Sequence, residues 1–185
     1  MPPPEPAPEF HRPLTVESLR ESGGGPAAAQ ADASERAALA RRFGARSVAA
    51  LEIEAESAPW GPGGWLVRGR ARARLEQTCV VTLEPVETAV DEPFERRFAP
   101  ESRFAEAEAL LAPDARDELE ALGAEIDLGE IAAETVALAL DPYPRKPGAA
   151  FEGRVQGPPG AEPLTDEAAR PFARLAALRN GSDER

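Results

Sequence analysis

The chain has 185 residues, of which 42% are hydrophobic but only 5% aromatic, so it can form one domain whose core is filled by alanine, leucine and valine. Its net charge of −12 is uneven, +1 over residues 1–75 and −13 over residues 76–185, and the acidic part disfavours sequence-independent RNA binding because it repels phosphate. The single cysteine excludes an internal disulfide and an all-cysteine metal site.

The first ten residues, MPPPEPAPEF, lack the basic and apolar regions of a signal peptide, and no apolar run reaches the length of a membrane span. We therefore expect a cytoplasmic protein. Residues 1–9 are rich in proline and glutamate and are predicted to be a disordered tail. Residues 10–19 predict a short strand, and glycines 23–25 predict a flexible link.

A helix is predicted to begin at Asp32, because Glu35 follows three residues later and the pair can form a capping box. The segment ASERAALARRF continues this helix, and Gly44 is well placed to end it.

From Ser47 the hydrophobic period changes to two, which predicts an amphipathic strand with glutamates on one face, at Glu52, Glu54 and Glu56. A turn over residues 59–64 leads to a second strand, LVRGRARARL, in which every second residue is arginine. Side chains alternate along a strand, so one face should carry Arg68, Arg70, Arg72 and Arg74.

A hairpin in even register would place Glu54 opposite Arg68 and Glu52 opposite Arg70, which leaves Arg72 and Arg74 without a partner. The arginines are then either a solvated face paired with glutamates, or a patch for phosphate or for an acidic partner. No aromatic residue is interleaved with them, which weakens the hypothesis of single-stranded RNA binding.

Two further strands are predicted over residues 78–83 and 86–98, and residues 101–125 form a loop or a broken helix. A second capping box, Asp127 with Glu130, opens the helix LGEIAAETVALAL, which Asp141 and Pro142 stop. The acidic side chains of this helix are either solvated or a receptor for a basic protein, at Asp127, Glu130, Glu134 and Asp141.

The predicted fold class is α+β, a mainly antiparallel sheet packed with a few helices and flanked by disordered termini. The domain spans residues 10–149, followed by a linker over 150–169, a short amphipathic helix over 170–179 and a tail over 180–185.

No catalytic, cofactor or metal site is predicted. Cys79 alternates with Val81 and Leu83, as expected for a small buried core residue, and nothing nearby supplies the basic setting of a reactive thiol. The lone histidine, His11, lies close to the predicted tail. Successive glutamates on one strand face are roughly 7 Å apart, too far to share a tightly bound ion.

Two long segments, QTCVVTLEPV at 77–86 and IDLGEIAAETVALALDPYPRKPGA at 126–149, resemble the hallmark segments of the YceD family, the large ribosomal RNA subunit accumulation proteins, in their alphaproteobacterial form. ERAALARRF at 35–43 and RPFARLAAL at 170–178 fit the same pattern. The motif residues are Cys79, Leu83 and Pro85. Many members carry a second cysteine where this chain has Thr82, which argues against a metal or redox role of the pair here.

The resemblance implies a non-enzymatic factor that supports accumulation of large-subunit (23S) ribosomal RNA and biogenesis of the large subunit. It would hold a basic ribosomal protein on its acidic half, or protect precursor RNA through the arginine strand. Family members are often encoded beside a small zinc-ribbon-type ribosomal protein, which points to a ribosomal protein as the partner. An RNA-processing enzyme and a regulator of ribosomal RNA transcription are the alternatives. No cofactor is implied, and the oligomeric state is left open.

Overall fold

The computed structural model describes residues 8–112 and 119–150. The chain divides into two units, Met1–Ala149 and Ala150–Arg185, and the described residues belong almost entirely to the first. The predicted linker, C-terminal helix and tail therefore lie outside the described residues, except for Ala150. No helix in the described part of the chain is long and apolar enough to cross a membrane.

The elements follow one another along the chain as β1 (Pro13–Thr15), α1 (Val16–Ser22), β2 (Gly25–Gln30), α2 (Ala33–Arg42), β3 (Ser47–Trp60), β4 (Gly64–Thr78), β5 (Pro85–Ala99), a 3₁₀ turn (Glu101–Arg103), α3 (Phe104–Glu108), β6 (Leu119–Ala121), β7 (Glu125–Asp127) and α4 (Leu128–Ala139).

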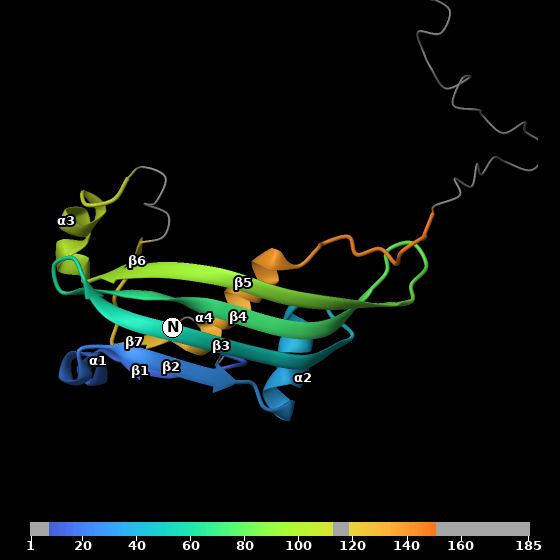
Figure 1. The fold of residues 1–185 in the computed structure, drawn as a ribbon, viewed down its shortest axis with the longest axis horizontal. Coiled ribbons are helices and arrows are strands. Elements are labelled where there is room, and N and C mark those ends of the chain that lie inside the picture. The colour runs from blue at the N-terminus through green and yellow to red at the C-terminus, as the bar shows by residue number, and fades with distance from the viewer. Residues whose placement is uncertain (1–7, 113–118, 151–185) are drawn as a thin grey trace, which may run out of the picture. The chain divides into compact units, whose positions relative to one another are not determined.

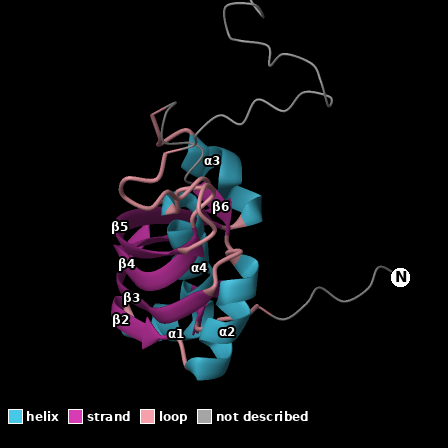
Figure 2. Cartoon of the chain, turned by 90° about the vertical axis from the view of Figure 1, so that its right-hand side faces the viewer, coloured by secondary structure: helices cyan, strands magenta, loops and turns pink. Residues whose placement is uncertain are grey.

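One five-stranded sheet has the order β2-β3-β4-β5-β6, and a two-stranded sheet joins β1 to β7. Neighbours from β2 to β5 are antiparallel, and only the short β6 runs parallel to its neighbour. The predicted α+β class with a mainly antiparallel sheet is confirmed. Figure 2 shows α2 and α4 against one face of the large sheet, and no described element covers the other.

The core lies between the large sheet and the helices. The faces predicted to be apolar are buried, as Leu51 and Ile53 on β3 and Val67 on β4 show. Leu39 of α2 and Val136 of α4 are fully buried against them. Burying each large aliphatic side chain stabilises the fold by about 1.5–3 kcal/mol, so this shared core sets which sheet face meets the helices.

The predicted capping box at the start of α2 is confirmed. The Asp32 carboxylate accepts hydrogen bonds from the N–H groups of Ser34 and Glu35, at 2.7 and 2.9 Å, and Glu35 accepts one from the N–H of Asp32 at 2.7 Å. Gly44 follows the end of the helix with a φ of +62°, a left-handed conformation that glycine adopts without strain.

The strand predicted over residues 10–19 is wrong beyond Thr15. Thr15 caps a helix instead, because its hydroxyl accepts a hydrogen bond from the N–H of Ser18, and Val16 and Leu19 are buried three residues apart. Gly23 ends this helix and Gly25 begins β2, so the predicted flexible link is a turn between two elements.

The strand predicted over residues 78–83 is also wrong, because β4 ends at Thr78 and β5 begins at Pro85. A loop connects them, closed by bonds from the N–H of Cys79 to the carbonyl of Glu84, at 2.8 Å, and from the N–H of Leu83 to that of Cys79, at 3.0 Å. Cys79 is fully buried and Leu83 is 71% exposed, so they do not share a face. Two consecutive antiparallel strands need a connection that reverses the chain direction. Here apolar residues form that connection, and their alternation resembles that of a strand.

Candidate interaction surface

The arginines of β4 lie on the sheet face that turns away from α2 and α4. Burial alternates along the strand as predicted, with Ala71 and Ala73 buried on the helix side and the arginines exposed or half-exposed on the outer side. We call the outward side chains of β3, β4 and β5 the outer sheet face.

The predicted hairpin register is wrong by two residues. Glu56 lies opposite Arg68, Glu54 opposite Arg70, and Glu52 opposite Arg72. The cause is the turn: β3 runs on to Trp60, which pairs with Gly64, and only three residues connect the strands. Gly61 and Gly63 take positive φ in that turn, which only glycine adopts without strain.

Carboxylates on both neighbouring strands engage three of the four arginines. Arg68 pairs with Glu56 at 3.2 Å, and Arg70 pairs with Asp91 of β5 at 2.8 Å. Arg72, predicted to be free, contacts Glu54 at 3.1 Å and Asp91 at 3.3 Å. Hydrogen bonding to Glu54 raises the pKa of Arg72, and hydrogen bonding to Arg70 lowers that of Asp91.

Sequence reasoning missed Asp91. The signal was present, because the buried Val90 and Phe94 place the odd-numbered residues of β5 on the outer sheet face. Arg74 is the exception among the four arginines: it lies between Ala50 and Ala89, and no described residue forms a hydrogen bond or ion pair with it.

A shallow depression of about 670 Å³ lies on the outer sheet face, above the place where Gly69 is paired with Phe94. Its charged lining alternates in sign, with Arg68 and Arg70 beside Glu54, Glu56 and Glu95. Such a lining does not form the convergent positive site that a phosphate group requires.

Two of the acidic residues predicted to receive a basic partner are engaged within the domain. Asp127 caps α4, where its carboxylate accepts from the N–H of Gly129 at 2.9 Å and from that of Arg12 at 2.8 Å. The predicted capping box is only half formed, because Glu130 turns to Arg42 of α2 and binds it with both carboxylate oxygens. Both acids therefore join elements of the fold.

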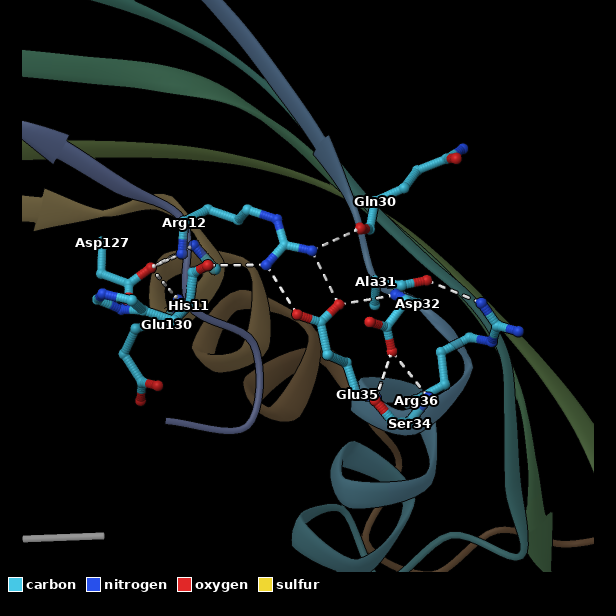
Figure 3. Close-up of polar contacts among 11 residues, drawn as sticks. His11, Arg12, Gln30, Ala31, Asp32, Ser34, Glu35, Arg36, Asp127 and Glu130 are labelled. Atoms are coloured by element: carbon cyan, nitrogen blue, oxygen red, sulfur yellow. Dashed lines mark hydrogen bonds and ion pairs between the residues drawn. The ribbon is translucent and has the colours of Figure 1, made fainter. Parts of the chain in front are cut away.

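Figure 3 shows that the contacts of Asp127 belong to a network around Arg12. The Arg12 guanidinium donates two hydrogen bonds to Glu35, at 2.7 and 2.9 Å, and one to the carbonyl of Gln30 at 3.1 Å. The bond to Arg12 is the main reason that the pKa of Glu35 is lowered. Arg12 thus ties the N-terminal segment to the starts of both long helices, a role that the sequence did not reveal.

His11 belongs to the same network. Its Nδ1 lies 2.7 Å from the Asp127 carboxylate and its Nε2 lies 3.5 Å from Glu125. The hydrogen bond to Asp127 raises the pKa of the imidazole. Its described polar contacts are carboxylates, and no nucleophilic side chain is among them.

The other two acidic candidates lie along and beyond α4. Glu134 is exposed, and its nearest described cation is Arg96 at 4.0 Å. Asp141 accepts from the N–H of Tyr143 at 2.8 Å, and its carbonyl accepts from the Gln77 side chain at 3.0 Å. Of the four acidic candidates, Glu134 alone has no polar contact with a described residue that is shorter than this weak ion pair.

The Cys79 thiol holds two segments together. Its sulfur accepts from the N–H groups of Thr82 and Lys146, both at 3.4 Å, and Lys146 reaches Glu84 with its ammonium at 2.6 Å. The hydrogen bond from the Thr82 side chain, followed by that from the Lys146 backbone, lowers the pKa of Cys79 to about 6. Full burial of the side chain keeps this thiol from reagents.

Within residues 8–112 and 119–150, no three His, Cys, Asp or Glu side chains are arranged to hold a metal ion. The two other motif residues take up different roles: Leu83 projects from the loop with a φ of +61°, and Pro85 begins β5.

Comparison with protein-family models places these segments in a known group. The model described as large ribosomal RNA subunit accumulation protein YceD matches residues 67–179. The chain belongs to the YceD family. The matched range begins in β4 and includes the Cys79 loop, β5 and α4, whereas β3 and α2 precede it. Searches of curated proteins and of solved structures gave no match.

Proposed function

We propose that this YceD-family protein is a non-enzymatic factor that supports accumulation of large-subunit (23S) ribosomal RNA, and that it acts by binding a basic ribosomal protein. The family description supports the role in accumulation. The observation that favours a protein partner over RNA is that carboxylates of β3 and β5 engage three of the four arginines of β4.

The balance of charge on the outer sheet face supports this choice. Strand alternation places carboxylates there that outnumber its arginines, even when Arg97 is counted among the arginines: Glu52, Glu54, Glu56, Glu76, Glu87, Asp91 and Glu95. An acidic surface favours encounter with basic proteins and opposes the approach of a phosphate backbone.

The enzyme alternative has less support. A processing hydrolase needs a base, a nucleophile or convergent acids at one accessible place. Here His11 pairs with Asp127, and Cys79 is buried.

A deletion strain tests the role in accumulation. Precursor and mature 23S RNA are measured after pulse labelling, and we expect normal synthesis followed by loss of the large-subunit species. Reduced synthesis of all ribosomal RNA would instead indicate the transcription regulator.

Affinity capture of the tagged full chain tests the kind of partner. We expect a basic ribosomal protein to be recovered after nuclease treatment of the lysate. If nuclease removes every partner, RNA is the direct ligand and the proposal fails. If the purified protein cleaves precursor RNA, the non-enzymatic role fails.

A further inference from the structure

The edge of β5 that faces away from β4 is open along most of its length. β5 is paired with β4 from Pro85 to Phe98, but with β6 only from Arg97 to Ala99. Within the described residues, no strand pairs with the stretch 85–96 on this side, and Figure 1 shows β5 as the upper border of the sheet. Unpaired main-chain groups at such an edge can accept an additional strand.

Hydrogen bonds at both ends of β5 show which residues face this edge. Where the loop closes, Cys79 bonds to Glu84, an even-numbered residue, so even-numbered residues of β5 bond to β4. At the other end the carbonyl of Ala99, an odd-numbered residue, accepts from the N–H of Leu122 on the far side. Pro93 is also odd-numbered. Its missing N–H therefore falls on the open side and removes no hydrogen bond between β5 and β4.

The open edge therefore presents the main-chain groups of Glu87, Ala89, Asp91, Pro93 and Glu95. The carbonyl of Asp91 already accepts a bond from the Arg70 side chain at 3.0 Å. No described residue bonds to the other groups, so they are available to a partner strand, with Pro93 offering only its carbonyl.

A groove follows the same edge. It has a volume of about 450 Å³ and lies between residues 92–96 of β5 and the last part of α4, where Thr135, Leu138 and Ala139 line it. Leu138 is 81% exposed, more than any other large hydrophobic residue of the described part. A strand added to β5 would bring one of its side chains over Leu138.

The charges around the edge select a basic occupant. No described residue forms a hydrogen bond or ion pair with Glu87 or Glu92, and Glu134 has only its 4.0 Å contact. Among the described residues that line the groove, Arg96 is the one cation, and it is held by Glu120 at 3.3 Å. A second copy of this chain would bring the same acidic edge, so like charges oppose pairing of β5 with itself.

We propose that the open edge of β5 binds an extended, basic segment of the partner protein as an added strand, with an apolar side chain of that segment on Leu138. This inference rests on the proposed function, because it gives the basic ribosomal protein a binding mode. Main-chain bonds to Glu87, Ala89 and Glu95 supply affinity, and the carboxylates of Glu87, Glu92 and Glu134 select lysine and arginine.

The binding mode is tested by incubating the full chain with an array of overlapping peptides that cover the large-subunit ribosomal proteins. We expect basic peptides with alternating apolar residues to bind. Amide hydrogen exchange measured by NMR with such a peptide should slow at Ala89 and Glu95, and should change little at Val90 and Phe94, which β4 already protects.

Ala89→Pro is the blocking variant, because it removes an edge N–H without removing a bond to β4. Ala89→Val is its matched control, since it keeps the N–H at the same exposed position. We expect Ala89→Pro to weaken peptide binding at least tenfold and Ala89→Val to leave it within twofold, with thermal unfolding confirming that both variants fold.

Three outcomes would overturn the inference: no basic peptide binds, binding occurs without protection of the odd-numbered amides, or both variants bind equally well. In each case the intact chain can still capture a basic ribosomal protein after nuclease treatment, in which event the proposed function stands and only the binding mode fails. If that capture fails as well, the proposed function fails with it.

Discussion

The outer sheet face and the open edge of β5 share a strand but differ in how much of their chemistry is engaged. On the outer sheet face, Arg68, Arg70 and Arg72 each contact a carboxylate at 3.3 Å or less. At the edge, the carbonyl of Asp91 accepts a bond from Arg70, but the other main-chain groups and the side chains of Glu87, Glu92 and Leu138 have no polar partner in the described part of the chain.

The contrast shows that a high density of charged residues in a sequence does not mean that these charges are free to bind a partner. The arginine strand is the most conspicuous feature of the chain, yet cross-strand pairs of this kind contribute only about 0.2–1 kcal/mol each and serve mainly to hold the register. The edge has only a weak signature in the sequence, Pro93 inside β5, because proline within a strand is largely confined to sheet edges.

The largest effect is expected where the register itself is disturbed. A Cβ at Gly69 would lie 2.0 Å from the Glu54 carbonyl oxygen and 2.8 Å from the Ala55 Cα, so β3 and β4 would have to separate. We expect Gly69→Ala to lower the free energy of unfolding by about 1–3 kcal/mol or more, as overpacking does. Urea denaturation measures it.

Gly123→Ala is the control for this substitution, because its Cβ would meet nothing closer than 3.9 Å and its φ is not positive. It should change the stability by less than about 0.5 kcal/mol. Equal effects of the two substitutions would show that the close approach at Gly69 does not hold the register.

A second change would turn the outer sheet face into a phosphate-binding face. Glu54→Gln combined with Asp91→Asn removes the carboxylates that engage Arg70 and Arg72. We expect affinity for single-stranded RNA to rise about tenfold at 50 mM salt, with a steeper salt dependence, because two arginines become free for phosphate. Fluorescence anisotropy with labelled RNA measures both.

Glu17→Gln with Glu21→Gln on α1 makes the same change of net charge away from the sheet. If this control gains as much RNA affinity, net charge alone decides RNA binding, and the pairing of the arginines is irrelevant to it.

Leu138→Ser tests the edge without touching the core. The side chain is 81% exposed, so we expect a change in stability within about 0.5 kcal/mol. Binding of the basic peptide, measured by calorimetry, should weaken about fivefold, since a leucine side chain contributes on the order of 1 kcal/mol when half of it is buried.

The matched control is Leu110→Ser, at another exposed leucine of the described part, 64% accessible and away from the groove. Equal loss of binding in both variants would contradict a specific contact at Leu138.

The smallest effect is expected from pH at His11. Its pKa is raised above 6.5 by Asp127, so its stabilising contribution is fully present below the unfolded pKa of about 6.5 and is lost as pH rises through the folded pKa. We expect the Tm difference between the wild type and His11→Gln to shrink from pH 6 to pH 8. Cys79, with its pKa lowered to about 6, titrates in both proteins and cancels in that difference.

A Tm difference that is constant over this pH range would show that the His11–Asp127 contact does not distinguish the two protonation states. Asp127→Asn should weaken the pH dependence of the difference without abolishing it, because Glu125, 3.5 Å from Nε2, also raises the pKa of His11. The substitution also removes the charge that favours the start of α4.

Local chemistry in the sequence was enough to determine the elements that depend on near neighbours. The period of two around Ile53 and Ala71, the capping box at Asp32 and the stop at Asp141 each predicted what the structure has. Each of these signals involves residues within a few positions of one another, so it can be recognised without knowledge of the rest of the chain. The α+β class followed from them.

Only the tertiary structure decided the register of β3 against β4 and the partners of the charged side chains. One residue more or less in the turn at Gly61–Gly63 moves every cross-strand pair, so Arg72 changed from free to doubly engaged. Residues distant in sequence bind the acids at the start of α4: the backbone N–H of Arg12 donates to Asp127, and the side chain of Arg42 donates to Glu130. Which charges and which strand edge stay available depends on these long-range contacts, and no local pattern encodes them.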